Sequence, residues 1–207
     1  ASCGTDAFLI GGSTGVTKEN LRMVVNAIHE NTDLPAILFP STGEAFCKEL
    51  DAILFMSILN SSDHMYITGI HSVAAPFVKM LNVECISMGY VIVEPGMTVG
   101  RVTQANLIER DDNITAVGYA VTAEMLGMKT VYFEAGSGAD KPIDPSMIAD
   151  IRENIDIFLI VGGGIRTPEA AKAAHDAGAN AIVTGTFVEQ CKDDSVIKAV
   201  IKAAKGI

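Results

Sequence analysis

The stretch FLIVGGGIRTPEAAKAAHDA, residues 158–177, contains one copy of the unit that the rest of the chain repeats. Phe158 to Val161 is a short apolar run followed directly by three glycines. Thr167 and Pro168 are residue types that favour the N-cap and the first turn of a helix. The stretch therefore predicts a buried strand, a glycine turn and a capped helix that runs to about Ala177.

The same alternation recurs along the chain. Further apolar runs predict strands over Ala7 to Gly12, Ala36 to Pro40, Ala52 to Ser57, Glu84 to Glu94, Lys129 to Glu134 and Ala181 to Thr184. Helices are predicted over Thr17 to Glu30, Gly43 to Leu50, a region broken at Pro76 that resumes to Leu81, Ile114 to Leu126, Asp144 to about Asn154 and Ser195 to Ala204. The strand runs are continuous rather than alternating, which is typical of parallel strands covered on both faces.

Seven strand–helix units can be counted, whereas a closed barrel of this kind has eight. We therefore expect an α/β fold, a modified (β/α)8 TIM barrel, with the first βα unit apparently absent from the chain as given. The 207 residues, of which 49% are hydrophobic, are enough for one core, so a single domain over residues 1–207 is expected. An open doubly wound sheet is the alternative.

Composition excludes several classes of function. The net charge of −10 argues against a nucleic-acid partner. No apolar run approaches the length of a transmembrane segment, and the first residues do not resemble a signal peptide, so a cytoplasmic protein is expected. The cysteines and histidines are scattered, which argues against a zinc site and for free thiols.

Glycines follow three successive predicted strands near the C-terminus. They lie in Ala135 to Gly138, in Gly162 to Gly164 and at Gly185, which Thr186 follows. In a barrel of parallel strands these turns meet at one rim, where glycine lets backbone amides approach an anion closely. The three turns together predict a phosphate-binding site.

Tyr132 and Glu134 end the strand that precedes the first of these turns. Side chains alternate along a strand, so both are expected on the same face, directed into the site if that face is the interior. Glu134 could accept hydrogen bonds from ligand hydroxyls or take a proton from one. The alternatives are a capping or ion-paired glutamate and a core tyrosine whose hydroxyl is satisfied. Earlier in the chain, Ser13 in GGST could bind a diphosphate or Mg²⁺, or instead cap the next helix.

Taken together, the motifs resemble those of one enzyme family. They are GGSTGVT (Gly11 to Thr17), LPAILFP (Leu34 to Pro40), DAILFMSILNS (Asp51 to Ser61), GYVIVEPGMTVG (Gly89 to Gly100), YFEAGSGA (Tyr132 to Ala139), IVGGGIRTPEAA (Ile160 to Ala171) and IVTGT (Ile182 to Thr186). Nearly the whole chain resembles the geranylgeranylglyceryl phosphate synthase family, in its archaeal form; bacterial relatives make heptaprenylglyceryl phosphate.

The resemblance implies a modified TIM barrel and a prenyltransferase of archaeal membrane lipid biosynthesis. The C3 hydroxyl of sn-glycerol 1-phosphate would attack C1 of geranylgeranyl diphosphate, forming an ether bond and releasing diphosphate. Mg²⁺ would be the cofactor, with Ser13 near it, and the enzyme would form a homo-oligomer. The resemblance also implies an acidic metal ligand and a basic residue on a strand preceding Ala1, and Pro40 to Lys48 departs from the family pattern.

The resemblance also assigns roles to individual residues. Tyr132 and Glu134 would act in catalysis, with Glu134 binding the glycerol hydroxyls and taking the proton. Substrate would be bound by Tyr132, Phe133, Glu134, Ala135, Gly136, Ser137, Gly138, Gly163, Gly164, Gly185 and Thr186. Candidates for limiting the prenyl chain length are Tyr90, Phe77 and Met88, each of which could instead be an ordinary core residue. Competing functions are another phosphosugar isomerase or synthase and a non-catalytic anion-binding barrel.

Overall fold

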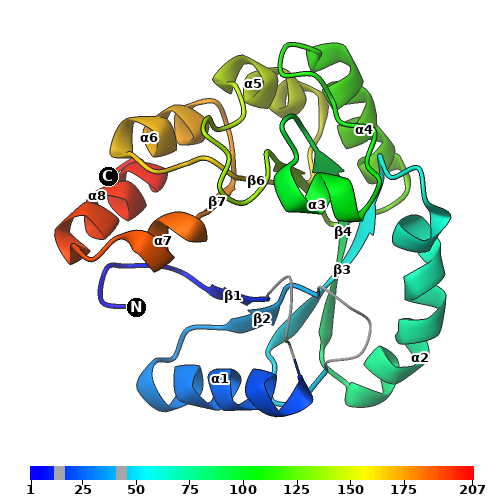
Figure 1. Ribbon diagram of the computed structural model, residues 1–207, viewed down its shortest axis with the longest axis vertical. Coiled ribbons are helices and arrows are strands. Elements are labelled where there is room, and N and C mark those ends of the chain that lie inside the picture. Colours follow the sequence, from blue (N-terminus) through cyan, green and yellow to red (C-terminus); the bar gives the residue numbers. More distant parts are fainter. Residues whose placement is uncertain (12–16, 41–45) are drawn as a thin grey trace.

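The computed structural model describes residues 1–11, 17–40 and 46–207, in which seven parallel strands form one curled sheet (Figure 1). The strands pair in chain order from β1 to β7. Their bounds are β1 Phe8–Ile10, β2 Ala36–Leu38, β3 Ala52–Ile58, β4 Glu84–Ile92, β5 Thr130–Glu134, β6 Phe158–Gly162 and β7 Ala181–Val183. The predicted α/β class is confirmed, and within the described residues β1 and β7 are the two edges of the sheet.

The longer helices form an outer ring around the sheet, whereas the short helix α3 lies inside this ring (Figure 1). Their bounds are α1 Lys18–Asn31, η1 Met65–Gly69, α2 Ile70–Leu81, α3 Met97–Val102, α4 Asn113–Met125, α5 Pro145–Asn154, α6 Pro168–Asp176, α7 Thr186–Gln190 and α8 Asp194–Ala204. The caps expected at Asp144 and Thr167 are present, because each side chain accepts a hydrogen bond from a backbone amide of the first turn.

Alternation along the strands separates two layers of buried side chains. On β5, Val131 and Phe133 are directed outward into the core beneath the helices. Tyr132, between them, is directed inward and packs with Tyr90 and Ile160 in the barrel interior. The inward face therefore carries the side chains that can reach a site at the end of the barrel.

Two predictions about helices are wrong. Pro76 does not break a helix but lies inside α2. Pro76 has no amide to bond the carbonyl of Ser72, but Ser72 is exposed to water, and burial of Ala74 and Val78 holds the helix together. Of the helix expected over 43–50, residues 46–50 form no helix, because a turn there buries Cys47 and Leu50 together under α1; residues 41–45 lie outside the described part of the chain.

Of three short helical segments, only η1, a π-helix that runs directly into α2, falls in a region expected to be helical. The helices α3 and α7 were not expected from the sequence. Each is only five or six residues long, too short to give a periodic apolar pattern. All three contribute side chains to the cavity described next.

Candidate active site

A cavity of about 710 Å³ lies at the carboxyl ends of the strands and has two chemically different ends. At one end it is lined by the turns that follow β5, β6 and β7. At the other it extends between β3 and α2, where the lining is almost entirely apolar. We call these the glycine end and the apolar arm. The shape suits a long ligand with an anionic head and a hydrocarbon tail.

The glycine end brings together the three turns that the sequence singled out. Ser137 and Gly138, Gly163 and Gly164, and Gly185 and Thr186 all line it. The hydroxyl oxygens of Ser137 and Thr186 lie 2.8 Å apart and share a hydrogen bond, which joins the first turn to the third. The turns therefore face one another across one end of the cavity.

Glycine is needed at these positions for different structural reasons. A Cβ at Gly162 would overlap the hydroxyl of Tyr132, and one at Gly163 would lie 2.6 Å from Oε1 of Glu134. Gly163 also has φ of +82°, a conformation that other residues rarely adopt. A Cβ at Gly185, by contrast, would meet no atom within 4 Å. The β6 glycines make room for Tyr132 and Glu134, whereas Gly185 borders open space.

Glu134 is a buried carboxyl with two hydrogen-bond donors. Only 7% of it is exposed. Oε2 accepts a hydrogen bond of 2.5 Å from the hydroxyl of Tyr132, and Oε1 accepts one of 2.8 Å from the amide of Gly136. Burial raises the pKa of Glu134, and the two hydrogen bonds lower the pKa in part. The result is a carboxylate positioned to receive a proton.

Tyr132 belongs to an aromatic cluster beneath Glu134. Its ring makes edge contacts with Tyr90, at a centroid distance of 5.0 Å, and with Phe39, at 6.2 Å. Burial, and then the charge of Glu134, raises the pKa of the Tyr132 hydroxyl well above its usual value. Tyr132 therefore stays protonated and donates to Glu134. It is both a core tyrosine with a satisfied hydroxyl and a part of the cavity wall.

Arg166 and Glu189 are cavity residues that sequence reasoning missed. A guanidinium nitrogen of Arg166 donates a hydrogen bond of 2.9 Å to the carbonyl oxygen of Gly138, which links the turn after β6 to the turn after β5. Among the described lining residues, Arg166 and His71 are the basic ones, and Arg166 is at the glycine end. Its place two residues after a triple glycine was a signal that could have identified it.

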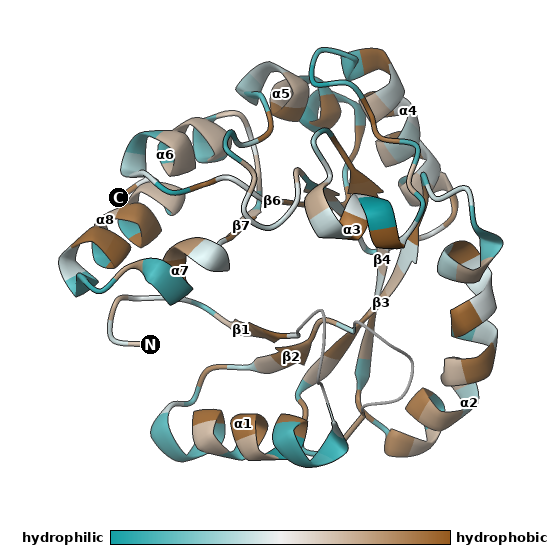
Figure 2. Cartoon of the chain, in the orientation of Figure 1, coloured by the Kyte–Doolittle hydropathy of each residue, from teal (hydrophilic) through white to brown (hydrophobic). Residues whose placement is uncertain are grey.

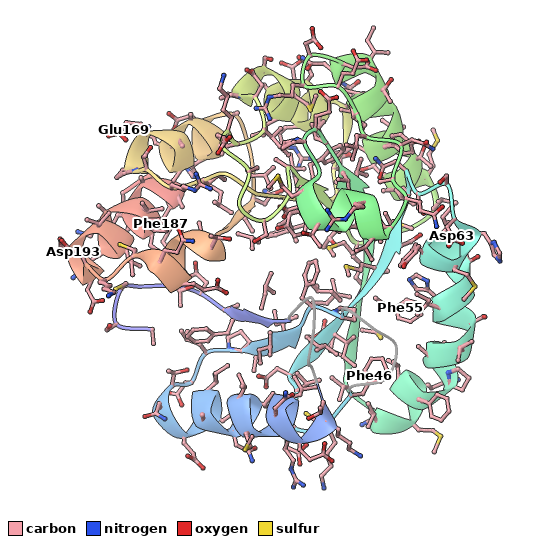
Figure 3. All side chains as sticks on the ribbon, viewed as in Figure 1. Phe46, Phe55, Asp63, Glu169, Phe187 and Asp193 are labelled. Carbon is pink, nitrogen blue, oxygen red and sulfur yellow. The ribbon has the colours of Figure 1, made fainter. Side chains whose placement is uncertain are left out.

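The apolar arm was also missed, because it is formed by residues from both faces of β3. Phe46 and Phe55 lie between β3 and α2 (Figure 3). The ring of Phe55 contacts His71 edge-on at 4.7 Å, and Ala74 and Val78 continue the wall along α2. Alternation of side chains along a strand predicts which residues share a face. It does not predict a cavity that residues from both faces line.

Comparison with known proteins agrees with this geometry. A model of the PcrB family matches residues 1–204. The chain belongs to the PcrB family. It is 45% identical over 205 residues to a geranylgeranylglyceryl phosphate synthase of Thermoplasma volcanium, covering 99% of this chain and 81% of that protein. It is 50% identical over 196 residues to one of Thermococcus gammatolerans, covering 95% of this chain and 77% of that protein.

A solved structure is similar over the same length. The crystal structure of (S)-3-O-geranylgeranylglyceryl phosphate synthase from Thermoplasma acidophilum, in complex with sn-glycerol-1-phosphate, superposes with a TM-score of 0.95 and 41% identity. The match covers 100% of this chain and 84% of that one. The resemblance drawn from the motifs is thus confirmed, and so is the barrel-like arrangement of strands and helices in this PcrB family member.

Some residues predicted to bind substrate do not face the cavity. The side chains of Phe133 and Ala135 are fully buried in the core beneath the helices, because residues between two inward-facing positions on a strand are directed outward. Gly136 donates its amide to Glu134, so it supports the carboxylate rather than lining the cavity. These three residues are not part of the described cavity lining, and their contact with substrate stays a prediction.

Of the three candidates for limiting chain length, only Tyr90 lines the cavity. Met88 is fully buried in the barrel interior, and Phe77 is directed away from the barrel and is largely exposed. Ser13, the predicted Mg²⁺ residue, lies outside the described residues. Among residues 1–11, 17–40 and 46–207 no group of three or more His, Cys, Asp and Glu side chains is placed to hold a metal ion.

Proposed function

We propose that this PcrB family member is a prenyltransferase that joins geranylgeranyl diphosphate to sn-glycerol 1-phosphate. The observation that carries this proposal is the single cavity with a glycine end, a buried carboxylate and an apolar arm. The named relatives support the activity, and the Thermoplasma acidophilum complex supports the glycerol phosphate. A phosphosugar isomerase has no need of an arm lined by Phe46, Phe55 and Val78.

In this proposal the glycine end holds glycerol phosphate. The backbone amides of Gly163, Gly164 and Gly185 and the hydroxyls of Ser137 and Thr186 are the donors for its phosphate oxygens. A phosphate placed here would replace the hydrogen bond that joins the two hydroxyls. Arg166 supplies positive charge beside it, in a chain whose net charge is −10.

The chemical step forms one carbon–oxygen bond, breaks another and transfers one proton. The C3 hydroxyl oxygen of glycerol phosphate bonds to C1 of the prenyl group, the C1–O bond to diphosphate breaks, and diphosphate leaves with the electron pair. The hydroxyl proton passes to the carboxylate of Glu134. An alcohol is a poor nucleophile, so positioning it beside a buried base contributes directly to the rate. Tyr132 holds that carboxylate in place.

The apolar arm would hold the prenyl chain. Its walls on β3 and α2 bury hydrocarbon, and each methylene removed from water contributes about 0.8 kcal/mol. Tyr90 lies in the interior next to Tyr132, so the reacting carbon of the chain would lie where the two ends of the cavity meet.

Mg²⁺ is proposed as the cofactor, on chemical grounds. It neutralises charge on a leaving diphosphate and is usually bound by one or two carboxylates together with phosphate oxygens and water. Among the described residues no group of three or more His, Cys, Asp and Glu side chains could hold the ion without the substrate. A requirement for the ion is tested by adding EDTA and then restoring Mg²⁺.

Two further expectations remain proposals. We propose a cytoplasmic enzyme that forms a homo-oligomer. Within the described residues no helix is both long enough and apolar enough to cross a bilayer.

The deciding experiment is product formation from both substrates. Geranylgeranyl diphosphate, sn-glycerol 1-phosphate and Mg²⁺ should yield geranylgeranylglyceryl phosphate and diphosphate, detected by mass spectrometry and by a diphosphate assay. Omitting glycerol phosphate, or replacing it with its sn-3 isomer, is the control. A folded protein that forms no ether product from these substrates would contradict the proposal.

A further inference from the structure

The helix α2 is apolar on more than the side that it buries. Ala74 and Val78 form part of the wall of the apolar arm. Val73, Phe77 and Met80 follow one another at helical spacing and are 65%, 62% and 81% exposed. Brown segments therefore recur along α2 in Figure 2. A helix with this much apolar surface is usually covered by something.

The charge around this helix differs from that of the whole chain. Residues 65–82 contain no Asp or Glu, although the chain has 25 acidic residues in 207. At the C-terminal end of α2, Leu81 borders a small cavity of about 280 Å³ that is also lined by Lys18, Arg22 and Lys48. In Figure 1 this end of α2 lies close to the beginning of α1, the helix that carries Lys18 and Arg22.

The basic residues exceed the acidic ones at this cavity. Glu49 is the acidic residue among the described lining, and it pairs with Arg22 at 3.0 Å. Desolvation raises the pKa of Glu49, but a backbone hydrogen bond and then the charge of Arg22 outweigh it and lower the pKa overall, so this carboxylate stays ionised. Lys18 and Lys48 leave an excess of positive charge at the C-terminal end of α2, the helix that carries Val73, Phe77 and Met80.

We propose that Val73, Phe77 and Met80 of α2, together with Lys18, Arg22 and Lys48, form a face that binds the surface of an anionic lipid bilayer. We call it the α2 face. Exposed apolar side chains enter the boundary between head groups and hydrocarbon, while lysine and arginine are attracted to anionic lipid. Positive charge gathered on one face of an acidic protein orients that face toward the membrane.

This inference rests on the proposed function and deepens it. A diphosphate with a long prenyl tail partitions into bilayers, and the arm proposed to hold the tail has α2 as its wall. Docking through the α2 face places the arm within one helix diameter, about 10 Å, of the lipid. The prenyl chain then moves from the bilayer to the arm with little of its surface passing through water.

The charges favour lipid over a second copy of this chain as the occupant. A symmetric dimer joins the same patch on both subunits, so it would bring two sets of these three cations toward one another. Anionic head groups neutralise the cations instead. A dimer formed through the α2 face is therefore the alternative that the experiment must be able to detect.

The test is co-sedimentation of the full chain with vesicles. Vesicles of equal parts phosphatidylglycerol and phosphatidylcholine should retain the protein at low salt, and vesicles of phosphatidylcholine alone should retain much less. Replacing Phe77 and Met80 by Ser, or Lys18 and Lys48 by Gln, should weaken binding, by about fivefold for each lysine lost. The matched control replaces Ile114 and Met125 by Ser, since these residues are 87% and 83% exposed but belong to α4 rather than to α2.

Two further measurements, the turnover of the variants and the molecular mass of the protein in solution, complete the test. With substrate dispersed in detergent, the two α2-face variants should turn over like wild type, but with substrate in vesicles they should be slower. Binding that is equal for both vesicle types, or unchanged in both variants, would overturn the inference. So would a dimer by light scattering that becomes a monomer in the Phe77 and Met80 variant. Vesicle binding without any ether product would refute the proposed function, and with it the transfer of a prenyl chain, but not the binding of the α2 face to lipid.

Discussion

Glu134 is buried with hydrogen-bond donors as partners, and it forms no ion pair within the described residues. A buried carboxylate without a cation loses solvation and gains little Coulomb energy, so it holds a proton more readily than an exposed one. Glycine at positions 162 and 163 makes this possible, since a Cβ at either one would collide with the Tyr132–Glu134 pair. The geometry of single residues thus supports a base rather than a structural salt bridge.

Replacing Glu134 by Gln removes the base and keeps the shape. We expect kcat to fall by about 10²–10⁴-fold, the usual contribution of general acid–base catalysis, with little change in KM for glycerol phosphate. Glu169→Gln, an exposed change on α6, is the control and should leave both constants unchanged. Steady-state kinetics measures both. Full turnover by the Glu134→Gln protein would exclude this carboxylate as the base.

Tyr132→Phe tests how the pKa of Glu134 is set. The Tyr132 hydrogen bond lowers the pKa of Glu134, so its loss should raise that pKa further. Because the base must be ionised, activity falls as pH drops through this pKa. The acidic limb of the pH profile of kcat should therefore move to higher pH in the variant. A limb that stays in place or moves to lower pH would show that Tyr132 does not control this carboxyl.

Arg166 is expected to contribute to binding glycerol phosphate. Loss of a charged hydrogen bond typically costs about 1.5–3 kcal/mol, so Arg166→Ala should raise KM for glycerol phosphate by about ten- to hundredfold. Lys172→Gln, which removes a positive charge on the following helix where it pairs with Asp176, should not. Initial rates at varied glycerol phosphate distinguish the two. Equal KM values for all three proteins would remove Arg166 from the site.

At the scale of secondary structure, the strands and the long helices were predictable from the sequence, because apolar runs and cap residues are local signals. The glycine turns after β5, β6 and β7 were predictable for the same reason. The apolar arm was not, because it depends on where α2 packs against β3 and on short helices that have no periodic pattern. Phe133 and Ala135 belong to the same motif as the cavity residues because a motif names neighbours in sequence, whereas alternation places their side chains on the opposite face.

The wall of the arm gives a prediction about substrate length. Ala74 lines the arm and is 6% exposed, so Ala74→Phe should fill part of the space for the prenyl tail. We expect KM for geranylgeranyl diphosphate to rise by about tenfold or more, which is the loss of two buried methylenes. Shorter prenyl diphosphates should lose less, and KM for glycerol phosphate, bound at the other end, should not change. An unchanged preference across prenyl lengths would place the tail elsewhere.

At the scale of the whole molecule, the two faces of the curled sheet carry different residues: those that stabilise the fold and those that form the cavity. The residues directed outward pack under the helices. Residues directed inward near the carboxyl ends of the strands line the cavity. Phe133, one residue from the base, belongs wholly to the first group. A change there should act on the fold and leave the reacting groups alone.

Phe133 makes that separation measurable. Phe133→Ala should lower the free energy of unfolding by about 3–5 kcal/mol, and Phe133→Leu by less, because the smaller cavity relaxes more easily. Denaturant titration gives both values. For the Phe133→Leu protein, kcat per folded molecule should remain near that of wild type. A large loss of kcat in a stable Phe133→Leu protein would mean that this side chain reaches the site after all.

The aromatic cluster has a practical consequence for spectroscopy. The chain contains no tryptophan and four tyrosines, and three of those, Tyr66, Tyr90 and Tyr132, line the cavity. Part of the ultraviolet emission of the unlabelled protein therefore comes from tyrosines of the cavity wall. Since a phenol that donates to a carboxylate emits weakly, a ligand that draws Glu134 away from Tyr132 should brighten the protein. Tyrosine fluorescence should therefore report ligand binding in the cavity, and it can be followed by stopped flow without attaching a dye.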